Sequence, residues 1–407
     1  MQKGKDLNAV KDALKKKAAF GPDIDIDSFD EGTYEPEGVD DLEDVSSELK
    51  DRMVNVGVMP SEEARSGTIM FIDNGMCHCS NRAQEGLELM STRDALAEHD
   101  WLSEYSWKAV DPSKDKFTAK SYLEDSDGYF IRVKAGYHVK DPLQTCMLIN
   151  KNKAIQNLHN IIIVEEGASL EIITGCTTKK NAEESLHVGV SEIYLKDDAS
   201  LSFSMIHNWG KATGVRPRTN TILGKNAKYI NNYVLLNPVG SMQSYPGAYL
   251  NGEGASATQN TMCLAHGGSD IDIGGMVVLN ARGTSAEIMS RSITKGEGRM
   301  IARGRLVGNA NGAKAHLECR SIILDDGGVT LAIPELESSV ADVEMTHEAA
   351  VGKIARDQIE YLMSRGLTED DAVSMIVRGF LVGGIKGLPD NLKKEIDEAV
   401  AKANLGS

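Results

Sequence analysis

The sequence predicts a mainly β fold with a β-solenoid at its centre and helical segments before and after it. Within residues 126–340, short runs of Val, Ile, Leu and Gly predominate, and only three prolines occur between Leu143 and Ile333. A small-residue turn signal recurs there at spacings of 31, 28, 28, 29 and 29 residues. Such a period in β-rich sequence is typical of a solenoid in which each repeat is one coil. The alternative is a set of ordinary hairpins with regular turns. The central residues of the signal are Ala168, Ala199, Ala227, Ala255, Thr284 and Ala313.

The chain divides into three predicted regions. At 407 residues it exceeds one ordinary domain. Residues 1–125 are mixed, with helical patterns near 5–18 and 82–106 and a short apolar segment around residue 70. Residues 126–340 are predicted to form the solenoid core, and residues 341–407 are predicted to be mainly helical.

Composition excludes several classes of function. A net charge of −16 and an acidic block at residues 23–44 argue against binding of nucleic acid, since a phosphate-binding surface needs clustered Lys and Arg. The alternative interpretation of the acidic block is a solvated or partly disordered segment. The Lys-rich start has no apolar core like that of a signal peptide, and 18 apolar residues never occur together. We therefore expect a cytoplasmic protein without membrane insertion. Six dispersed cysteines suit thiols, metal ligands or core residues better than disulfides.

Two helices are predicted near the C-terminus. Thr346 can cap the first, with Glu348 favoured by the dipole of its first turn, and Gly366 can end it in a left-handed conformation. Thr368, followed three residues later by Asp371, resembles a capping box that starts the second. A last helix is expected from Asp390 to about residue 404. Apolar residues recur at roughly helical spacing through the pair, at Ile354, Ile359, Leu362, Met363, Met375, Ile376 and Phe380.

Cysteines recur at equivalent places in successive predicted coils. Cys176, His207 and Cys263 each lie eight residues after the centre of a turn signal. Cys319 lies six residues after one, on the same face if the strand is continuous, and Cys146 precedes Cys176 by 30 residues, about one coil. At roughly 4.8 Å per coil, Cys176 and Cys263 would be about 14 Å apart, too far to share one cluster. The column is either a core stripe or a route for sulfur.

Three segments resemble the SufB/SufD family, the scaffold proteins of iron–sulfur cluster assembly. Residues 345–380, which begin Met-Thr-His-Glu, resemble the family's C-terminal signature most closely. Thr174-Gly175-Cys176-Thr177 matches a Gly-Cys-Ser/Thr motif, and His207-Asn208-Trp209 matches Gln-Asn-Trp. The resemblance covers about residues 130–385. It implies a right-handed parallel β-helix and a non-catalytic scaffold that assembles a transient cluster, expected to be 4Fe–4S.

The resemblance also implies candidate site residues. In the family the motif cysteine, here Cys176, is associated with accepting persulfide sulfur, and Cys263 is a second sulfur-handling candidate from the column. The Thr-His-Glu position supplies a histidine in SufD and a glutamate in SufB, and here His347 and Glu348 occupy both places. A cluster-associated cysteine of bacterial SufB is missing, since Gly328 stands about there. We hypothesise a cluster site made of Cys319, His347 and Glu348 from two copies of the chain.

Cys77 and Cys79 form a second conspicuous group, in Cys77-His78-Cys79. Structural zinc normally needs four ligands in more widely spaced pairs, and no second pair lies nearby in the sequence. Thiols without a role are therefore favoured, and the pair stays a secondary candidate for metal or sulfur.

Partners follow from the resemblance and from a missing motif. No Gly-x4-Gly-Lys-Ser/Thr P-loop occurs in the sequence. The glycine-rich residues 383–387 are too short for this motif and lack its hydroxyl residue. Nucleotide hydrolysis would come from SufC, the family's ABC-type ATPase, which docks on helices that match residues 346–381. The chain itself is expected to form a homodimer and to serve apo iron–sulfur proteins. The docking candidates are Ile359, Met375, Ile376 and Phe380.

Two other classes of function stay open. A purely structural subunit of an ATPase complex would carry no metal chemistry. A carbohydrate-active or acyl-transferring solenoid enzyme could use Asp270 and Asp272 on one strand face as acid and base. However, alternating aspartates are common on exposed strands, and 21 aromatic residues are few for sugar stacking.

Overall fold

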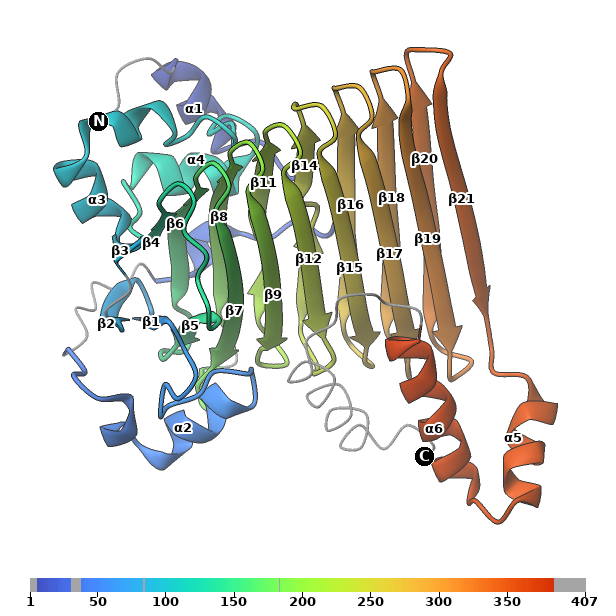
Figure 1. Cartoon of the computed structure of the whole chain (residues 1–407). Helices are drawn as coiled ribbons and strands as arrows, with labels where there is room; N and C mark the ends of the chain where they lie inside the picture. Colours follow the sequence, from blue (N-terminus) through green and yellow to red (C-terminus); the bar gives the residue numbers. More distant parts are fainter. Residues whose placement is uncertain (1–5, 31–37, 83–84, 183, 384–407) are drawn as a thin grey trace.

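The computed structural model describes residues 6–30, 38–82, 85–182 and 184–383, and its main body is a β-solenoid of stacked coils (Figure 1). Two long sheets, of ten and eleven strands, form the solenoid. Strands from successive coils pair in parallel, as expected when each coil repeats the path of the one before it. The predicted mainly β solenoid is therefore confirmed.

The ten-stranded sheet runs from one end of the solenoid to the other. All its pairings are parallel except the one between its first two strands. In spatial order its strands are β2 (Gly75–Asn81), β1 (Gly67–Ile72), β5 (Leu143–Ile149), β7 (Ser169–Thr178), β9 (Ser200–Asn208), β12 (Lys228–Leu235), β15 (Ser256–Ala265), β17 (Ser285–Thr294), β19 (Ala313–Ile323) and β21 (Val343–Gly352).

The eleven-stranded sheet forms the opposite side of the solenoid. It begins at the N-terminal end with an antiparallel pair, and its last strand pairs on one edge only. Its strands are β3 (Leu87–Ser91), β4 (Tyr129–Val133), β6 (Ile155–Val164), β8 (Leu186–Leu195), β10 (Gly214–Val215), β11 (Arg218–Leu223), β13 (Ser241–Ser244), β14 (Gly247–Leu250), β16 (Asp270–Leu279), β18 (Arg299–Gly308) and β20 (Val329–Ser338).

Each recurrent turn signal begins with a residue in the left-handed conformation. Glycine adopts it without a Cβ penalty, and Asn and Asp tolerate it. The small residue that follows is buried at all six places. Residues after these turns pair strand to strand at the spacings expected from sequence. The left-handed residues are Gly167, Asp198, Asn226, Gly254, Gly283 and Gly312, with φ of 67°, 58°, 53°, 71°, 69° and 74°.

Four short helices and three 3-10 turns surround the N-terminal end. Apolar residues of α3 and of the segment after it pack with Phe130 and Ile161, on the outer face of the eleven-stranded sheet. Together with β1, β2 and β3 these elements cover the first coils (Figure 1). The elements are α1 (Leu7–Ala13), η1 (Ile26–Ser28), η2 (Leu42–Asp44), α2 (Ser47–Val54), α3 (Thr92–Glu98), η3 (Asp100–Glu104) and α4 (Lys116–Leu123).

The C-terminal end of the solenoid carries two helices, α5 (Arg356–Ser364) and α6 (Glu369–Val382). Val373, Val377 and Leu381 of α6 are buried in a cluster that includes the outer face of the ten-stranded sheet. No helix in the described part of the chain is long and apolar enough to span a bilayer.

The predicted start of the first C-terminal helix is wrong. Thr346, His347 and Glu348 lie in β21, and α5 begins only after Ala355. Ten residues of β21 pair with β19, and this tertiary pairing overrides the helix preference of the Glu and Ala residues. The other end signals are confirmed: Gly366 has a φ of 99°, and the Thr368 side chain accepts a hydrogen bond from the Asp371 amide. The helix expected from Asp390 lies outside the described residues.

Candidate functional site

The predicted column of side chains exists inside the solenoid. Cys176 pairs with His207, His207 with Leu235, and Leu235 with Cys263 in successive parallel strands. All four side chains are buried, and the two cysteines belong to the main core between the sheets. Three coil steps separate the cysteines, which corresponds to about 14 Å.

Cys146 does not belong to this column. Met147, and not Cys146, lies opposite Cys176, because the coil between them is 29 residues long and not 30. A one-residue difference turns a strand side chain to the other face. Cys146 accordingly packs in a separate cluster with Met70 and Cys77.

Cys176 is in an apolar environment. It is 1% exposed, and its sulfur lies 4.0 Å from the Met147 sulfur. Burial raises its pKa well above the ordinary value, so the thiol is protonated at neutral pH. A cavity of about 20 Å³ adjoins it, lined partly by Tyr129 and Thr174, and one water molecule fits such a volume. Among the described residues, no cation is close enough to Cys176 to lower its pKa and favour a thiolate.

His207 of the column forms a pair with Tyr233 beside it, and the sequence pattern did not predict this pair. The Tyr233 hydroxyl lies 2.7 Å from His207 Nδ1, and burial lowers the His207 pKa well below its usual value. His207 Nε2 is buried and has no hydrogen-bond partner among the described residues. Tyr233 follows Met205 in the adjacent inward-facing column, so the alternation of strand residues was the signal that could have found it.

Cys319 lies inside the last part of the core, one column away from Cys263. It is 1% exposed and sits on β19, two coil steps beyond the strand of Cys263. Burial, and secondarily the charge of Glu318, raises its pKa to about 11. Burial likewise raises the pKa of Cys263. Both thiols are therefore protonated in the isolated chain.

The structure brings Cys319 and His347 to the same face of the sheet, but not Glu348. His347 pairs with Leu317, an interior residue two positions before Cys319, so both side chains are on the interior side of adjacent strands. Glu348 pairs with Glu318 on the outer side, where Arg320 Nη2 donates to Glu348 Oε1 at 2.7 Å. Within one copy, the described residues contain no group of three metal-binding side chains.

Within the described part of the chain, no further coil stacks on the last one. There β21 pairs only with β19, and β20 pairs only with β18. Long edge strands with unpaired backbone groups are templates for another strand. Large apolar side chains remain exposed on these two strands, at Val329, Leu331, Leu336 and Val351.

The Cys77 and Cys79 group is divided by the fold. Cys77 is buried, with its thiol directed to the Met70 carbonyl at 3.4 Å, whereas Cys79 is more exposed and lies 3.7 Å from the Leu89 carbonyl. Burial raises their pKa values to about 12 and about 11. His78 between them is engaged with the Val39 carbonyl at 2.7 Å. The described residues therefore support no metal site at this place.

The four docking candidates differ in accessibility. Ile359 is 8% exposed, and Ile376 and Phe380 pack against the same internal cluster. Met375 is 42% exposed. Of the four, Met375 therefore offers the most free surface, and Ile359 is a packing residue in this chain.

Gly328, near which the resemblance implies a cluster-associated cysteine, has no free space for a side chain. A Cβ at this position would lie 2.7 Å from Thr294 Cγ2. Such a contact requires the neighbours to move. The local packing thus agrees with the absence of a thiol here.

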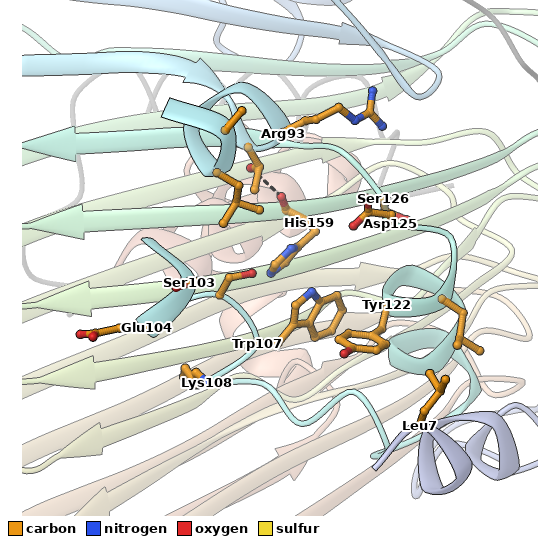
Figure 2. A pocket seen from close by; sticks show the side chains of 15 residues that line it. Leu7, Arg93, Ser103, Glu104, Trp107, Lys108, Tyr122, Asp125, Ser126 and His159 are labelled. Carbon is orange, nitrogen blue, oxygen red and sulfur yellow. Dashed lines mark hydrogen bonds between the residues drawn. The ribbon is translucent and has the colours of Figure 1, made fainter. Parts of the chain in front are cut away.

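Neither the aspartate pair nor a large cavity supports the enzyme alternative. Arg303 binds both oxygens of Asp272 at 2.6 and 3.0 Å, and Arg299 pairs with Asp270 at 2.9 Å. A cavity of about 1150 Å³ lies near the N-terminal helices. Figure 2 shows His159 and Trp107 among the side chains that line it. No cysteine is among its lining residues, and His159 is held by Glu192 at 2.9 Å. The pairing of these groups argues for structural roles.

A family model and several known proteins of one family match this chain. The family model described as "SUF system FeS cluster assembly, SufBD core domain" matches residues 147–380. An "Iron-sulfur cluster assembly SufBD family protein" of Methanothermobacter thermautotrophicus is 44% identical over 394 residues, covering 96% of each chain. One from Archaeoglobus fulgidus is 42% identical, covering 87% of this chain and 95% of its own. The "Iron-sulfur cluster assembly protein SufB" of Bacillus subtilis is 30% identical, covering 94% and 84%.

Proposed function

The chain belongs to the SufB/SufD family of iron–sulfur cluster assembly proteins, and we propose that it is the scaffold on which a nascent cluster is built between two copies of the chain. The cluster is cargo, transient and of the 4Fe–4S type, and it passes to apo-proteins. The observation that carries the proposal is the placement of Cys319 and His347 on one face at the open end of the solenoid.

A twofold arrangement of two copies supplies the ligands that one copy lacks. If the edge strands β21 meet across a twofold axis, both copies contribute Cys319 and His347 to one interface. Thiolate and imidazole are ligands that iron–sulfur clusters accept. Glu348, on the outer side of the same strand, supplies a weaker carboxylate ligand only if the strand turns or the partner reaches it. Iron binding would displace the thiol proton of Cys319 despite its raised pKa.

The interior column is proposed as the sulfur-handling part of the scaffold. Cys176 and Cys263 bracket His207 and Leu235 in one row, and Met147 extends the row beyond Cys176. Thioether and thiol groups are soft and polarisable, which suits sulfur. Because Cys176 is 1% exposed, loading it with sulfur requires local opening of the coil.

A partner is proposed to supply the energy. The SufC-type ABC ATPase would dock on α5 and α6, where Met375 is exposed. ATP binding would move these helices and change the interface at β21, which lies next to them in sequence. The scaffold would act in the cytoplasm as a homodimer without catalytic chemistry of its own.

Anaerobic reconstitution with iron and sulfide tests this function. Iron and sulfide are counted per dimer, and Mössbauer spectra are recorded for wild type, Cys319→Ser and the control Cys77→Ser. We expect wild type and the control to hold a cluster that transfers to an apo-ferredoxin, and Cys319→Ser to lose it. If no variant holds a stoichiometric cluster, with or without the ATPase, a purely structural subunit is the better description.

A further inference from the structure

Four charged residues form a staggered block on the outer face of the last three strands of the ten-stranded sheet. Arg291 on β17 pairs in register with Arg320 on β19, and Glu318 on β19 pairs with Glu348 on β21. Like charges directly opposite each other on neighbouring strands are destabilising. Ion pairs between the arginines and the glutamates therefore have to offset the repulsion within each like-charged pair.

The ion pairs connect these residues into a single path. Arg291 Nη1 pairs with Glu318 Oε1, and Arg320 Nη2 lies 3.3 Å from Glu318 Oε2. The same Arg320 nitrogen lies 2.7 Å from Glu348 Oε1. The order along the path is Arg291, Glu318, Arg320, Glu348, so opposite charges alternate from β17 to the edge strand.

The path is buried at one end and open at the other. The side chains of Arg291 and Glu318 are 5% and 12% exposed, whereas those of Arg320 and Glu348 are 40% and 53% exposed. Screening by solvent weakens ion pairs at the open end. The buried end therefore fixes the network, and Glu348 depends on Arg320 for its orientation.

Helix α6 covers the buried end. The Arg291 guanidinium lies 5.7 Å from the centre of the Phe380 ring, and its Nη2 lies 3.5 Å from the Gly383 carbonyl. A cleft of about 490 Å³ adjoins these groups, lined by Arg291, Glu318, Arg320 and Phe380 among others. This cleft leaves space beside Arg291 on the side of Phe380 and Gly383, at the end of α6.

We propose that Arg320 is a positioning residue for Glu348, and that Glu318 and Arg291 extend this control to the position of α6. Without Arg320, the carboxylates of Glu318 and Glu348 face each other across the two strands. Their repulsion turns the Glu348 side chain away from Glu318 and out of its present orientation. A shift of α6 acts on Glu348 by the same path, through Arg291 and Glu318. The inference rests on the proposed function only for the role of Glu348 as a cluster ligand.

Hydrogen exchange in the full chain tests the positioning without any cluster. We expect Arg320→Gln to raise amide exchange in residues 343–352 about fivefold, a typical size for coupling between sites, and Arg320→Lys to restore part of the protection. Arg291→Gln should raise exchange in both α6 and β21, although Arg291 belongs to neither. The control is Lys314→Gln, which removes the pair of Lys314 with Glu344 at 2.9 Å on the same two strands but outside the path.

Cluster loading of the same variants gives the second measurement. We expect Arg320→Gln to lower the iron bound per dimer as far as Glu348→Gln does, with Arg320→Lys intermediate and Lys314→Gln like wild type. Unchanged exchange and unchanged loading in Arg320→Gln would overturn the proposal. If Arg291→Gln changes α6 alone, its extension to the helix is wrong. If the exchange pattern appears but no variant, wild type included, loads a cluster, the positioning stands and the proposed function fails.

Discussion

Cys319 and His347 lie on the same side of the last two strands of the ten-stranded sheet, two residues apart in register. Cys319 pairs with Ala349, and His347 pairs with Leu317. From the strand spacing and the rise per residue, their Cα atoms are about 8 Å apart. A cluster can span side chains at such a separation, whereas the cysteines of the interior column are too far apart.

Replacing His347 by Ala should lower cluster loading at the proposed site. The change removes a nitrogen donor from the face that carries Cys319, and we expect iron affinity to fall at least about tenfold. The control is Thr346→Ala, because Thr346 is the preceding residue on the opposite face, where it contacts His316 at 2.8 Å. Iron and sulfide are counted for both variants. Equal losses would point to damage of the strand and not to a ligand.

Replacing Val351 by Lys should dissociate the proposed homodimer. Val351 lies opposite Ser321 on the edge strand and is 44% exposed in the single chain. An unpaired charge buried in an interface there would cost about 2 kcal/mol or more. Val54→Lys is a matched control, since Val54 is 45% exposed on α2, away from the edge. Light scattering after size-exclusion chromatography gives the mass, and a Val351→Lys variant that stays dimeric would place the interface elsewhere.

The solenoid could be predicted because its signals are local. A left-handed turn favours Gly, Asn or Asp, so Gly167, Asp198 and Asn226 mark their turns without knowledge of the rest of the chain. Equal spacing after these turns then places Cys176 and Cys263 in one column. Both inferences need only the period of the repeat and the alternation of strand side chains.

The rest of the site depends on contacts that are distant in sequence. The sequence predicts Cys146 one residue away from its place in the register, because the recurrent small-residue signal begins only at Gly167 and does not fix the 29-residue length of the coil before it. The strand at Thr346 was predicted as helix, because its pairing with β19 is a tertiary contact. The protonated state of Cys176 arises from burial among residues of several coils. None of these properties can be predicted from the local pattern of residues.

Stability should fall at alkaline pH, and Cys319 should contribute to the fall. Burial raises its pKa from 9.0 to about 11, so between these values the unfolded state has lost the thiol proton while the folded state keeps it. The unfolded state then binds fewer protons, and the free energy of unfolding decreases as pH rises, by at most about 1.4 kcal/mol per pH unit for one group. Below pH 9 this contribution is fully present.

Urea unfolding at pH 8, 9, 10 and 11 measures the effect. The comparison of wild type with Cys319→Ala removes the contribution of the other titrating groups. We expect the free energy of unfolding to fall less steeply with pH in the variant. Parallel curves would show that the thiol of Cys319 is accessible to hydroxide in the folded chain.

Introducing a cysteine by Gly328→Cys, near the place where the resemblance implies one, should destabilise this chain. The new Cβ would lie 2.7 Å from Thr294 Cγ2, and overpacking of this kind costs about 1–3 kcal/mol. Gly352→Cys is the control, because no atom lies within 4 Å of a Cβ built there. Thermal unfolding of the apo-protein compares the two variants. A stable Gly328→Cys variant that binds more iron would show that the site tolerates the bacterial ligand.

Replacing Met375 by Asp should weaken binding of the proposed ATPase partner without unfolding the chain. Met375 is 42% exposed on α6 while its neighbour Ile376 packs internally, so of the four docking candidates Met375 can be changed with the least disturbance of the helix pair. Truncating and charging an exposed apolar anchor in an interface typically costs about 2 kcal/mol. Met59→Asp is the matched control, because Met59 is the same residue type at 40% exposure, before β1. Calorimetric titration of both variants with a SufC-type ATPase gives the affinities. Equal affinities for wild type and Met375→Asp would move the docking surface away from this face of α6, and equal losses in both variants would mean that binding responds to net charge and not to the helix.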